Sequence, residues 1–275
     1  MAHTLHIRRG GRIILLVIGI AISVFAARAA PAQQAPASAG PVSQQLIDDL
    51  VAANRILADQ GVLDGWGHVS VRHPLDPNRY LLSRSRAPEL VTADDIMEFD
   101  LDSNPVDAKG RDLYSERFIH GEIYKTRPDV MAVVHSHAPA LIPFGITKTP
   151  LQPVYHRSAF ISAGVPVFEI RERGGMTDML IRDRALGHAL ADALGDHPAA
   201  LMRGHGAVIV GPSIQRVVGR SIFLPLSATL QLQAAALGGQ VTYLDAEEAR
   251  KIEAREGYGL ARSWEAWKRK AMAKP

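Results

Sequence analysis

The sequence predicts an α/β layered domain, and two observations support that fold class. Segments with helical apolar spacing alternate with short, largely apolar segments from residue 43 to about residue 270. Such alternation is typical of helices that pack against a central sheet. The chain has 275 residues, is 47% hydrophobic and 21% charged, and shows no linker within residues 43–245, which fits one globular domain with a substantial core.

The first half of this domain begins with a helix over residues 43–61, where Ser43 is a candidate N-cap and Gly61 a C-terminal stop. Its apolar residues recur at the three- and four-residue spacing of one helix face. Three strands and a helix follow: strands at 68–73, 79–83 and 96–100, and a helix at 115–129 that ends near Pro128.

The second half starts with the run "VMAVVH" (130–135), whose continuous apolar character indicates a strand buried on both faces. The remaining elements are expected in this order: a strand at 165–170, a helix at 182–198, two strands around the "GHG" turn within 199–211, a helical region at 213–238, and a charged terminal helix at 245–270. Pro225 is expected to kink or divide the long helical region.

The N-terminus has the layout of a secretory signal peptide, which we assign to residues 1–32. Three arginines precede an uncharged run at residues 13–27, and the small-x-small patterns "ARAA" and "APAQ" follow it. The run is short for a membrane span, so an uncleaved anchor is the alternative. Residues 33–42 are Pro/Ala-rich and are expected to form a flexible lead-in to a domain at 43–275. We therefore expect a periplasmic or secreted protein with no membrane contact after signal cleavage.

Charge and cysteine content exclude several function classes. The net charge is +3, but residues 1–32 carry four arginines and no acids, so the mature chain has a charge of about −1. No basic patch interleaved with aromatic residues is present, so we expect no nucleic-acid partner. Because there is no cysteine, any metal must be held by His, Asp or Glu.

Three histidines are candidate metal ligands. His135 and His137 stand two apart at the end of the apolar run 130–135, so both imidazoles can point to one face of a strand. His205 lies between two glycines, which let the backbone approach closely. Three neutral imidazoles suit a divalent transition metal with an open position. Spacing alone leaves the alternative open that these histidines are hydrogen-bonded structural residues.

Three motifs, in order, resemble the class II aldolase/adducin family: "GHVSVR" at 67–72, "YSERFIHGEIYKTRPDVMAVVHSHAPA" at 114–140 and "LMRGHGAVIVG" at 201–211. The resemblance covers roughly residues 43–245. It implies a three-layer α/β/α fold with a central, mostly antiparallel sheet. It also implies one divalent ion per subunit, Zn²⁺ or Mn²⁺, on His135, His137 and His205, and Glu116 as the catalytic acid/base. A homotetramer with active sites between subunits is implied as well.

The sequence departs from the sugar-phosphate enzymes of that family where they hold the phosphate. His68 replaces an Asn, Arg84 and Arg86 stand where small residues are usual, and Tyr114-Ser115 replaces a Ser-Ser pair. Arginine forks bind carboxylates and stack on planar rings, and His156 is a further candidate to flank a planar substrate. This pattern is similar to the branch that decarboxylates aromatic or heteroaromatic acids. The alternative for the two arginines is that both are solvated surface residues.

We therefore expect a metal-dependent carbon–carbon lyase, favoured as a decarboxylase of an aromatic or other hydroxy-carboxylate, acting on a small molecule. One alternative is an aldolase or epimerase acting on a sugar or sugar phosphate. Another is a non-catalytic binding protein of the periplasm, as adducin heads are non-catalytic relatives of the fold. The presence of Glu116 with the three histidines favours an enzyme.

Overall fold

A computed structural model describes residues 35–255 and 260–273, all within the unit Ala35–Pro275. The predicted signal peptide, residues 1–32, lies outside the described residues. The described part of the lead-in, residues 35–42, contains no helix or strand. It is nevertheless attached to the sheet, because the Ser38 hydroxyl and the Ala39 N–H both donate to the Glu98 carboxylate, at 2.6 and 2.7 Å.

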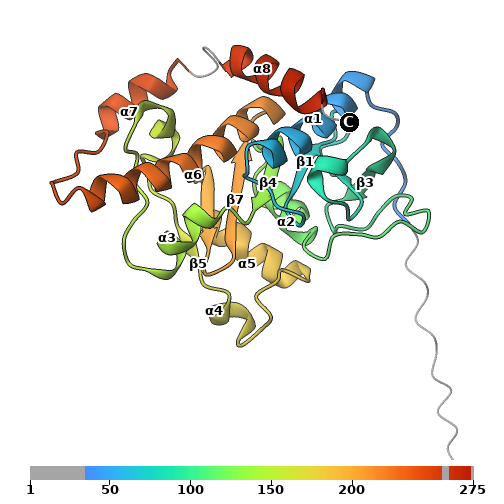
Figure 1. The fold of residues 1–275 in the computed structure, drawn as a ribbon. Coiled ribbons are helices and arrows are strands. Elements are labelled where there is room, and N and C mark those ends of the chain that lie inside the picture. The colour runs from blue at the N-terminus through green and yellow to red at the C-terminus, as the bar shows by residue number, and fades with distance from the viewer. Residues whose placement is uncertain (1–34, 256–259, 274–275) are drawn as a thin grey trace, which may run out of the picture. The chain divides into compact units, whose positions relative to one another are not determined.

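A seven-stranded sheet forms the middle of this unit, in the order β3-β2-β1-β4-β7-β6-β5 (Figure 1). Its strands are β1 His68–Arg72, β2 Arg79–Ser83, β3 Ile96–Asp100, β4 Ala132–Ser136, β5 Val167–Phe168, β6 Ala199–Met202 and β7 Gly206–Gly211. Every neighbouring pair is antiparallel except β5 with β6. The predicted α/β class with a mostly antiparallel sheet is thus confirmed.

Helices cover both faces of the sheet, which makes the three layers. The helices are α1 Gln44–Asp59, α2 Phe118–Thr126, α3 Ile142–Ile146, α4 Arg171–Gly174, α5 Arg184–Leu194, α6 Ile214–Ala236, α7 Ala246–Glu253 and α8 Leu260–Met272. Helices α1, α6 and α8 contribute to one hydrophobic core, and α2 and α5 to the other. Ser43 caps α1 as predicted, since its hydroxyl accepts the Leu46 N–H at 3.3 Å.

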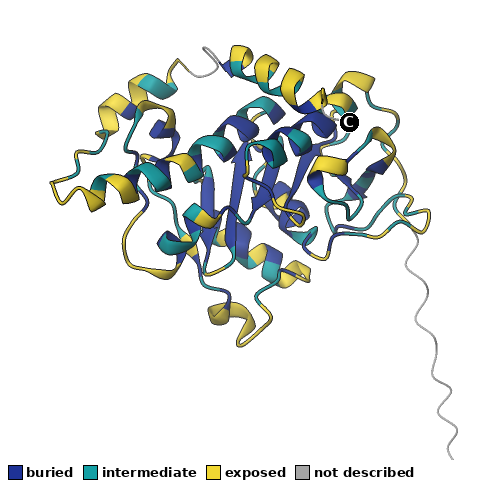
Figure 2. Ribbon diagram, viewed as in Figure 1, coloured by how far each residue is buried: buried dark blue, intermediate teal, exposed yellow. Residues whose placement is uncertain are grey.

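The central strands are buried on both faces, as the apolar run 130–135 predicts (Figure 2). Successive residues of a strand point to opposite faces, so each strand serves both cores. In β4, Ala132 and Val134 enter the core under α1 and α6, whereas Val133 enters the core under α2 and α5. His135 therefore emerges on the α2 side of the sheet, and the register pairs it with His68 of β1.

Two expectations about the C-terminal third can be compared with the structure. Of the kink or division expected at Pro225, division does not occur: Pro225 lies inside α6, and Leu224 and Ala228 on either side are buried in the core and hold the helix in place. Such packing offsets the cost of an interior proline, about 3 kcal/mol. The terminal region forms two helices, α7 and α8, rather than one. Helix α7 ends at Glu253, and residues 254–255 follow it as a turn.

Within residues 35–255 and 260–273, no helix is both long and apolar enough to cross a membrane.

Candidate metal centre

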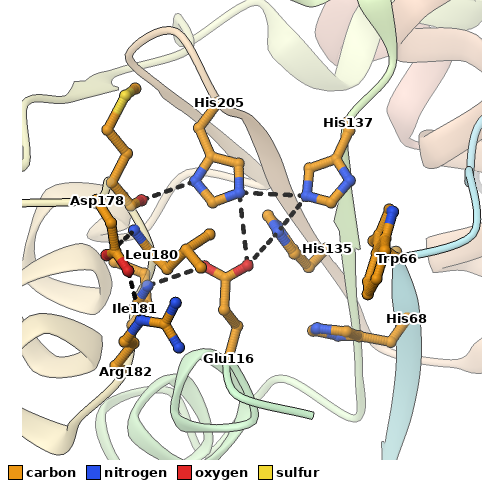
Figure 3. Close-up of polar contacts among 12 residues, drawn as sticks. Trp66, His68, Glu116, His135, His137, Asp178, Leu180, Ile181, Arg182 and His205 are labelled. Atoms are coloured by element: carbon orange, nitrogen blue, oxygen red, sulfur yellow. Dashed lines mark hydrogen bonds and ion pairs between the residues drawn. The ribbon is translucent and has the colours of Figure 1, made fainter. Parts of the chain in front are cut away.

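Four side chains from three separate parts of the chain meet where the central strand β4 ends and its neighbour β7 begins (Figure 3). They are Glu116, two residues before α2; His135 at the end of β4; His137 just after it; and His205 in the turn between β6 and β7. One ligand atom from each lies within 4.8 Å of all the others. The i, i+2 geometry predicted for the first two histidines is observed, with 3.0 Å between their Nε2 atoms.

The Nδ1 partners of the three histidines fix where each ring carries its proton. His135 Nδ1 lies 3.2 Å from the Ala207 carbonyl, and His205 Nδ1 lies 2.9 Å from the Met179 carbonyl. His137 Nδ1 lies 3.0 and 3.1 Å from the two carboxylate oxygens of Asp64. These oxygens only accept, so each neutral ring has its proton on Nδ1 and a lone pair on Nε2.

Three lone pairs that face one another have no hydrogen to share, and a cation satisfies them. The Nε2 atom of His137 is 3.0 Å from that of His135 and 3.2 Å from that of His205. Tetrahedral ligands on bonds of about 2.0–2.1 Å, typical of zinc–imidazole contacts, are separated by about 3.3 Å. The donor set therefore fits a divalent transition ion.

Glu116 completes the group as its carboxylate. Its Oε2 lies 3.5 Å from the Nε2 atoms of both His135 and His205, while its Oε1 accepts the Ile181 backbone N–H at 2.9 Å. Burial raises the pKa of Glu116, but the two adjacent imidazoles outweigh burial and hold that pKa well below its usual range. Conversely, burial lowers the pKa of His205, but Glu116 outweighs it and the pKa is raised. Glu116 is thus ionised beside the centre.

The glycines around His205 explain how the turn brings it into the group. Gly204 has a φ of +62°, a left-handed conformation that glycine adopts without steric cost. Gly206 begins β7 so close to β4 that a Cβ at this position would collide with the Ser136 carbonyl. Larger residues at either position would push His205 away from His135 and His137.

A cavity of about 400 Å³ opens beside the centre. Its walls include Glu116 and His137 from the centre, and predicted substrate-contact residues His68, Tyr114 and Ser115. The cavity is lined in addition by Trp66, Ser85, Leu113, Leu180 and Arg182. The structure thus brings half of the predicted substrate residues together with the predicted ligands, next to aromatic ring faces.

The other predicted substrate residues lie elsewhere in the subunit. Arg84 and Arg86 point to the buried Asp95, with N–O distances of 2.6 and 3.3 Å, and neither lines the cavity. His156 lines a different cavity of about 300 Å³, together with Phe160 and Phe223 among others. Within one chain these three residues are separate from the metal centre, and their predicted contact with substrate stays a prediction.

The Tyr114 hydroxyl is already engaged by the backbone of the 83–89 turn. It donates to the Arg86 carbonyl, and the Arg86 N–H lies 3.3 Å from it. Burial raises the pKa of Tyr114. This side chain therefore offers the cavity its ring, 4.4 Å from the ring of His68 between centroids, more than its hydroxyl.

Sequence reasoning missed four contributors to the site. Asp64 orients His137, the Ile181 N–H fixes Glu116, Trp66 forms part of the cavity wall with 74% of its surface exposed, and Arg182 lies at the cavity beside Asp178 (Figure 3). All four lie in loops, where no periodicity predicts direction. The one available indication was the isolated Trp66 in "DGWGHV", an aromatic residue amid turn residues.

Comparison with known proteins identifies the family. Residues 48–232 match the model of the class II aldolase and adducin N-terminal domain, which is more than half of the chain. The chain belongs to the class II aldolase and adducin family. The resemblance carried by the three sequence motifs is therefore confirmed.

Relatives within this family include decarboxylases. The chain is 36% identical to decarboxylase tropJ of Talaromyces stipitatus over 242 residues, covering 80% of this chain and 91% of that protein. It is 33% identical to the 3,4-dihydroxyphthalate decarboxylase of Arthrobacter keyseri over 206 residues, covering 69% of this chain and 79% of that enzyme.

Solved structures of the family share the fold. An L-fuculose 1-phosphate aldolase from Glaciozyma antarctica superposes with a TM-score of 0.68 at 24% identity, covering 85% of this chain and 94% of that one. An aldolase II superfamily protein from Pseudomonas syringae superposes with a TM-score of 0.69 at 25% identity, covering 84% and 94%. The layered α/β architecture is thus that of the class II aldolases.

Proposed function

We propose that the protein is a divalent-metal-dependent carbon–carbon lyase that decarboxylates a hydroxylated aromatic carboxylate. The observation that carries this proposal is the convergence of three imidazole lone pairs and one carboxylate beside a cavity walled by Trp66, His68 and Tyr114. TropJ is named a decarboxylase, and the Arthrobacter relative is named a 3,4-dihydroxyphthalate decarboxylase. These two names support a carboxy-lyase over other lyases.

His135, His137 and His205 would hold the ion, with Glu116 beside it, and Zn²⁺ and Mn²⁺ both suit such a set. When bound, the ion supplies a Lewis acid that stabilises negative charge on substrate oxygens as the carbon–carbon bond breaks. The protein's own contribution is to orient the substrate and to move one proton.

The walls of the cavity orient the substrate. The exposed indole of Trp66 and the ring of Tyr114 offer faces on which a planar ring can lie. Arg182 places a guanidinium at the cavity, and its side chain is 53% exposed, so it can pair with a substrate carboxylate as well as with Asp178.

Glu116 moves the proton. Decarboxylation replaces a C–CO₂⁻ bond by a C–H bond, so one proton must reach the ring carbon as carbon dioxide leaves. Glu116 is the carboxylate beside the centre, and its Oε2 takes the proton of an ortho hydroxyl group of the substrate. It then returns that proton to the ring carbon. The Ile181 N–H holds one carboxylate oxygen in place, which leaves Oε2 to carry the proton.

The test is release of carbon dioxide by the full chain loaded with Zn²⁺ or Mn²⁺. We would follow ¹³C-carboxyl-labelled 3,4-dihydroxyphthalate and a panel of ortho-hydroxybenzoates by NMR. His135→Ala should abolish release, whereas His188→Ala, a control histidine with 57% side-chain exposure near Glu122, should retain it. One ion per chain with no release from any substrate of the panel would reject the decarboxylase in favour of aldol cleavage.

Two further proposals concern assembly and location. We propose that residues 1–32 are removed during export, which mass spectrometry of the mature protein tests, and an intact N-terminus would refute it. We also propose a homotetramer, following the resemblance to the sugar-phosphate aldolases. Light scattering coupled to gel filtration gives the mass directly, and a monomer would reject this proposal.

A further inference from the structure

Two further histidines, His68 and His120, lie at the cavity wall and behind it and are not among the proposed metal ligands. His68 of β1 places Nδ1 2.6 Å from Nε2 of His120 in α2. His120 Nδ1 lies 2.6 Å from the Ser70 hydroxyl, which lies 2.8 Å from the Tyr124 hydroxyl. All four side chains are at most 1% exposed. They form a continuous hydrogen-bond chain that runs from Tyr124 in the interior through Ser70 and His120 to His68 at the cavity wall.

The residue spacing of strand β1 and of helix α2 brings the members of this hydrogen-bond chain together. His68 and Ser70 are two apart on β1 and face the same side, and His120 and Tyr124 are four apart on α2 and share one helix face. Arg72, the next residue on that side of β1, ties the two elements together by donating to the Tyr124 carbonyl at 2.8 Å. The geometry is therefore set by regular secondary structure and is rigid.

Both histidines are neutral. Each ring is at most 1% exposed, and its hydrogen-bond partners are an imidazole or a hydroxyl, which carry no charge to balance a buried imidazolium. Burial also lowers the pKa of His120 to about 3. Each ring consequently carries a single N–H. Only one proton lies between the two rings, so the tautomer of one dictates the tautomer of the other.

The Tyr124 hydroxyl determines the direction in which hydrogens are donated along this hydrogen-bond chain. Among the described residues, the partners of that hydroxyl are the Ser70 hydroxyl at 2.8 Å and the Val133 backbone N–H, and an N–H only donates. If Ser70 donated to Tyr124, the phenolic hydrogen would lie in the interior with no acceptor among these partners, which is unfavourable. Tyr124 therefore donates to Ser70, Ser70 to His120 Nδ1, and His120 Nε2–H to His68 Nδ1. The proton of His68 then lies on Nε2.

We infer that Tyr124, Ser70 and His120 are positioning residues that fix His68 as an Nε2–H donor to the cavity, where it selects a substrate with an anionic carboxylate or phenolate oxygen. His68 lines the cavity with Glu116 and His137, and its ring centroid is 5.2 Å from that of His135. A donor held in this way cannot turn into an acceptor, so it disfavours substrate groups that present only hydrogens. The substrate half of this inference rests on the proposed function; the tautomer half does not.

The tautomer is measured directly, without substrate. The full chain labelled with ¹⁵N-histidine gives a two-bond ¹H–¹⁵N correlation spectrum in which protonated and unprotonated ring nitrogens differ in shift. His68→Gln and His120→Gln assign the signals. We expect Nε2–H for both His68 and His120. An Nδ1–H signal for His68 would overturn the inference, whatever the activity of the protein.

Two substitutions at His120 then separate positioning from packing. In His120→Gln the side-chain amide can still donate to His68 Nδ1, so we expect the His68 tautomer to be retained. In His120→Leu that donor is gone, and we expect mixed tautomers at His68 with unchanged metal content. Ser70→Ala gives the same comparison through a smaller change if the leucine variant fails to fold. A pure Nε2–H signal in both His120→Leu and Ser70→Ala would contradict the inference.

Kinetics test the substrate half. KM rises in inverse proportion to the fraction of the protein whose His68 still carries the proton on Nε2, so evenly mixed tautomers raise it about twofold. We expect that rise for 3,4-dihydroxyphthalate in His120→Leu and the wild-type KM in His120→Gln. Equal KM values in wild type and His120→Leu would overturn the selection role. The expected tautomers with no carbon dioxide release in the wild type would instead reject the proposed function alone.

Discussion

Asp64 is the residue whose replacement should weaken metal binding without touching a ligand atom. Its carboxylate holds His137 through Nδ1, at 3.0 and 3.1 Å, and so keeps the lone pair of that ring directed at the centre. The same carboxylate accepts the backbone N–H groups of Trp66 and Gly67 at 2.9 and 3.0 Å. Asp64→Ala removes all of these contacts at once.

The size of the effect follows from the exposure of the pair. Loss of a carboxylate that orients a metal-bound histidine typically reduces metal affinity about 10–100-fold. The Asp64 side chain is 49% exposed, so solvent screens the interaction and the lower part of that range applies. We expect Asp64→Ala to raise Kd about 10–30-fold, or about 1.4–2 kcal/mol. Asp64→Asn keeps a carbonyl acceptor and should cost only a few-fold.

The assay is a competition titration of metal-free protein against a chromophoric chelator. Asp76→Ala is the matched control, because Asp76 likewise accepts a backbone N–H two residues later, that of Asn78 at 2.8 Å, and its carboxylate contacts no histidine among the described residues. We expect the control to bind with the wild-type Kd. If Asp64→Ala binds as tightly as wild type, or no more weakly than Asp76→Ala, the orienting role of Asp64 is refuted.

Three other predictions concern the centre and its surroundings. His205→Ala should reduce metal content well below one ion per chain in elemental analysis, and full retention would remove His205 from the ligand set. Glu116→Gln should keep the metal but lower kcat by about 10²–10⁴, the usual contribution of a general acid/base, whereas unchanged turnover would exclude it from proton transfer. Asp95→Asn should lower the free energy of unfolding in urea by about 1–3 kcal/mol at pH 7, because it weakens the contact with Arg84. Burial raises the pKa of Asp95, but Arg84 and Thr92 outweigh burial and hold it below its ordinary value of 3.8. The stabilisation by Asp95 is therefore complete above that value and lost as the pH falls through the lower, folded-state pKa, so the difference from Asp95→Asn should shrink in acid; a pH-independent difference would contradict this origin.

Most of the fold could be predicted from the sequence, because the spacing of the apolar residues and the capping and turn residues beside them indicated the same helices and strands. The cap Ser43 and the buried run of β4 needed no knowledge of partners. Whether Pro225 divides its helix could not be predicted, because its local cost is visible in the sequence and the compensating burial of Leu224 and Ala228 is not. Tertiary packing decided that position.

The metal ligands and their surroundings differ in how far the sequence predicts them. The spacing of His135 and His137 places both on one face, and the family motif adds His205 and Glu116. Asp64 could not be predicted, because 73 residues separate it from His137 and no spacing rule connects a loop aspartate with a strand end. Likewise, the charge of Arg84 and Arg86 suggested that they bind the substrate. Their ion pairs with Asp95 cannot be recognised from the sequence and are seen only in the structure.

The most direct test of the account is whether carbon dioxide release depends on one ion in this centre. We would strip the full chain with a chelator and add Zn²⁺ or Mn²⁺ stepwise. At each step we would measure the rate of release from 3,4-dihydroxyphthalate and from the active ortho-hydroxybenzoates. The account predicts no release without metal and a rise that ends at one equivalent per chain. Full activity in the stripped protein, or no activity at any metal content, would contradict it.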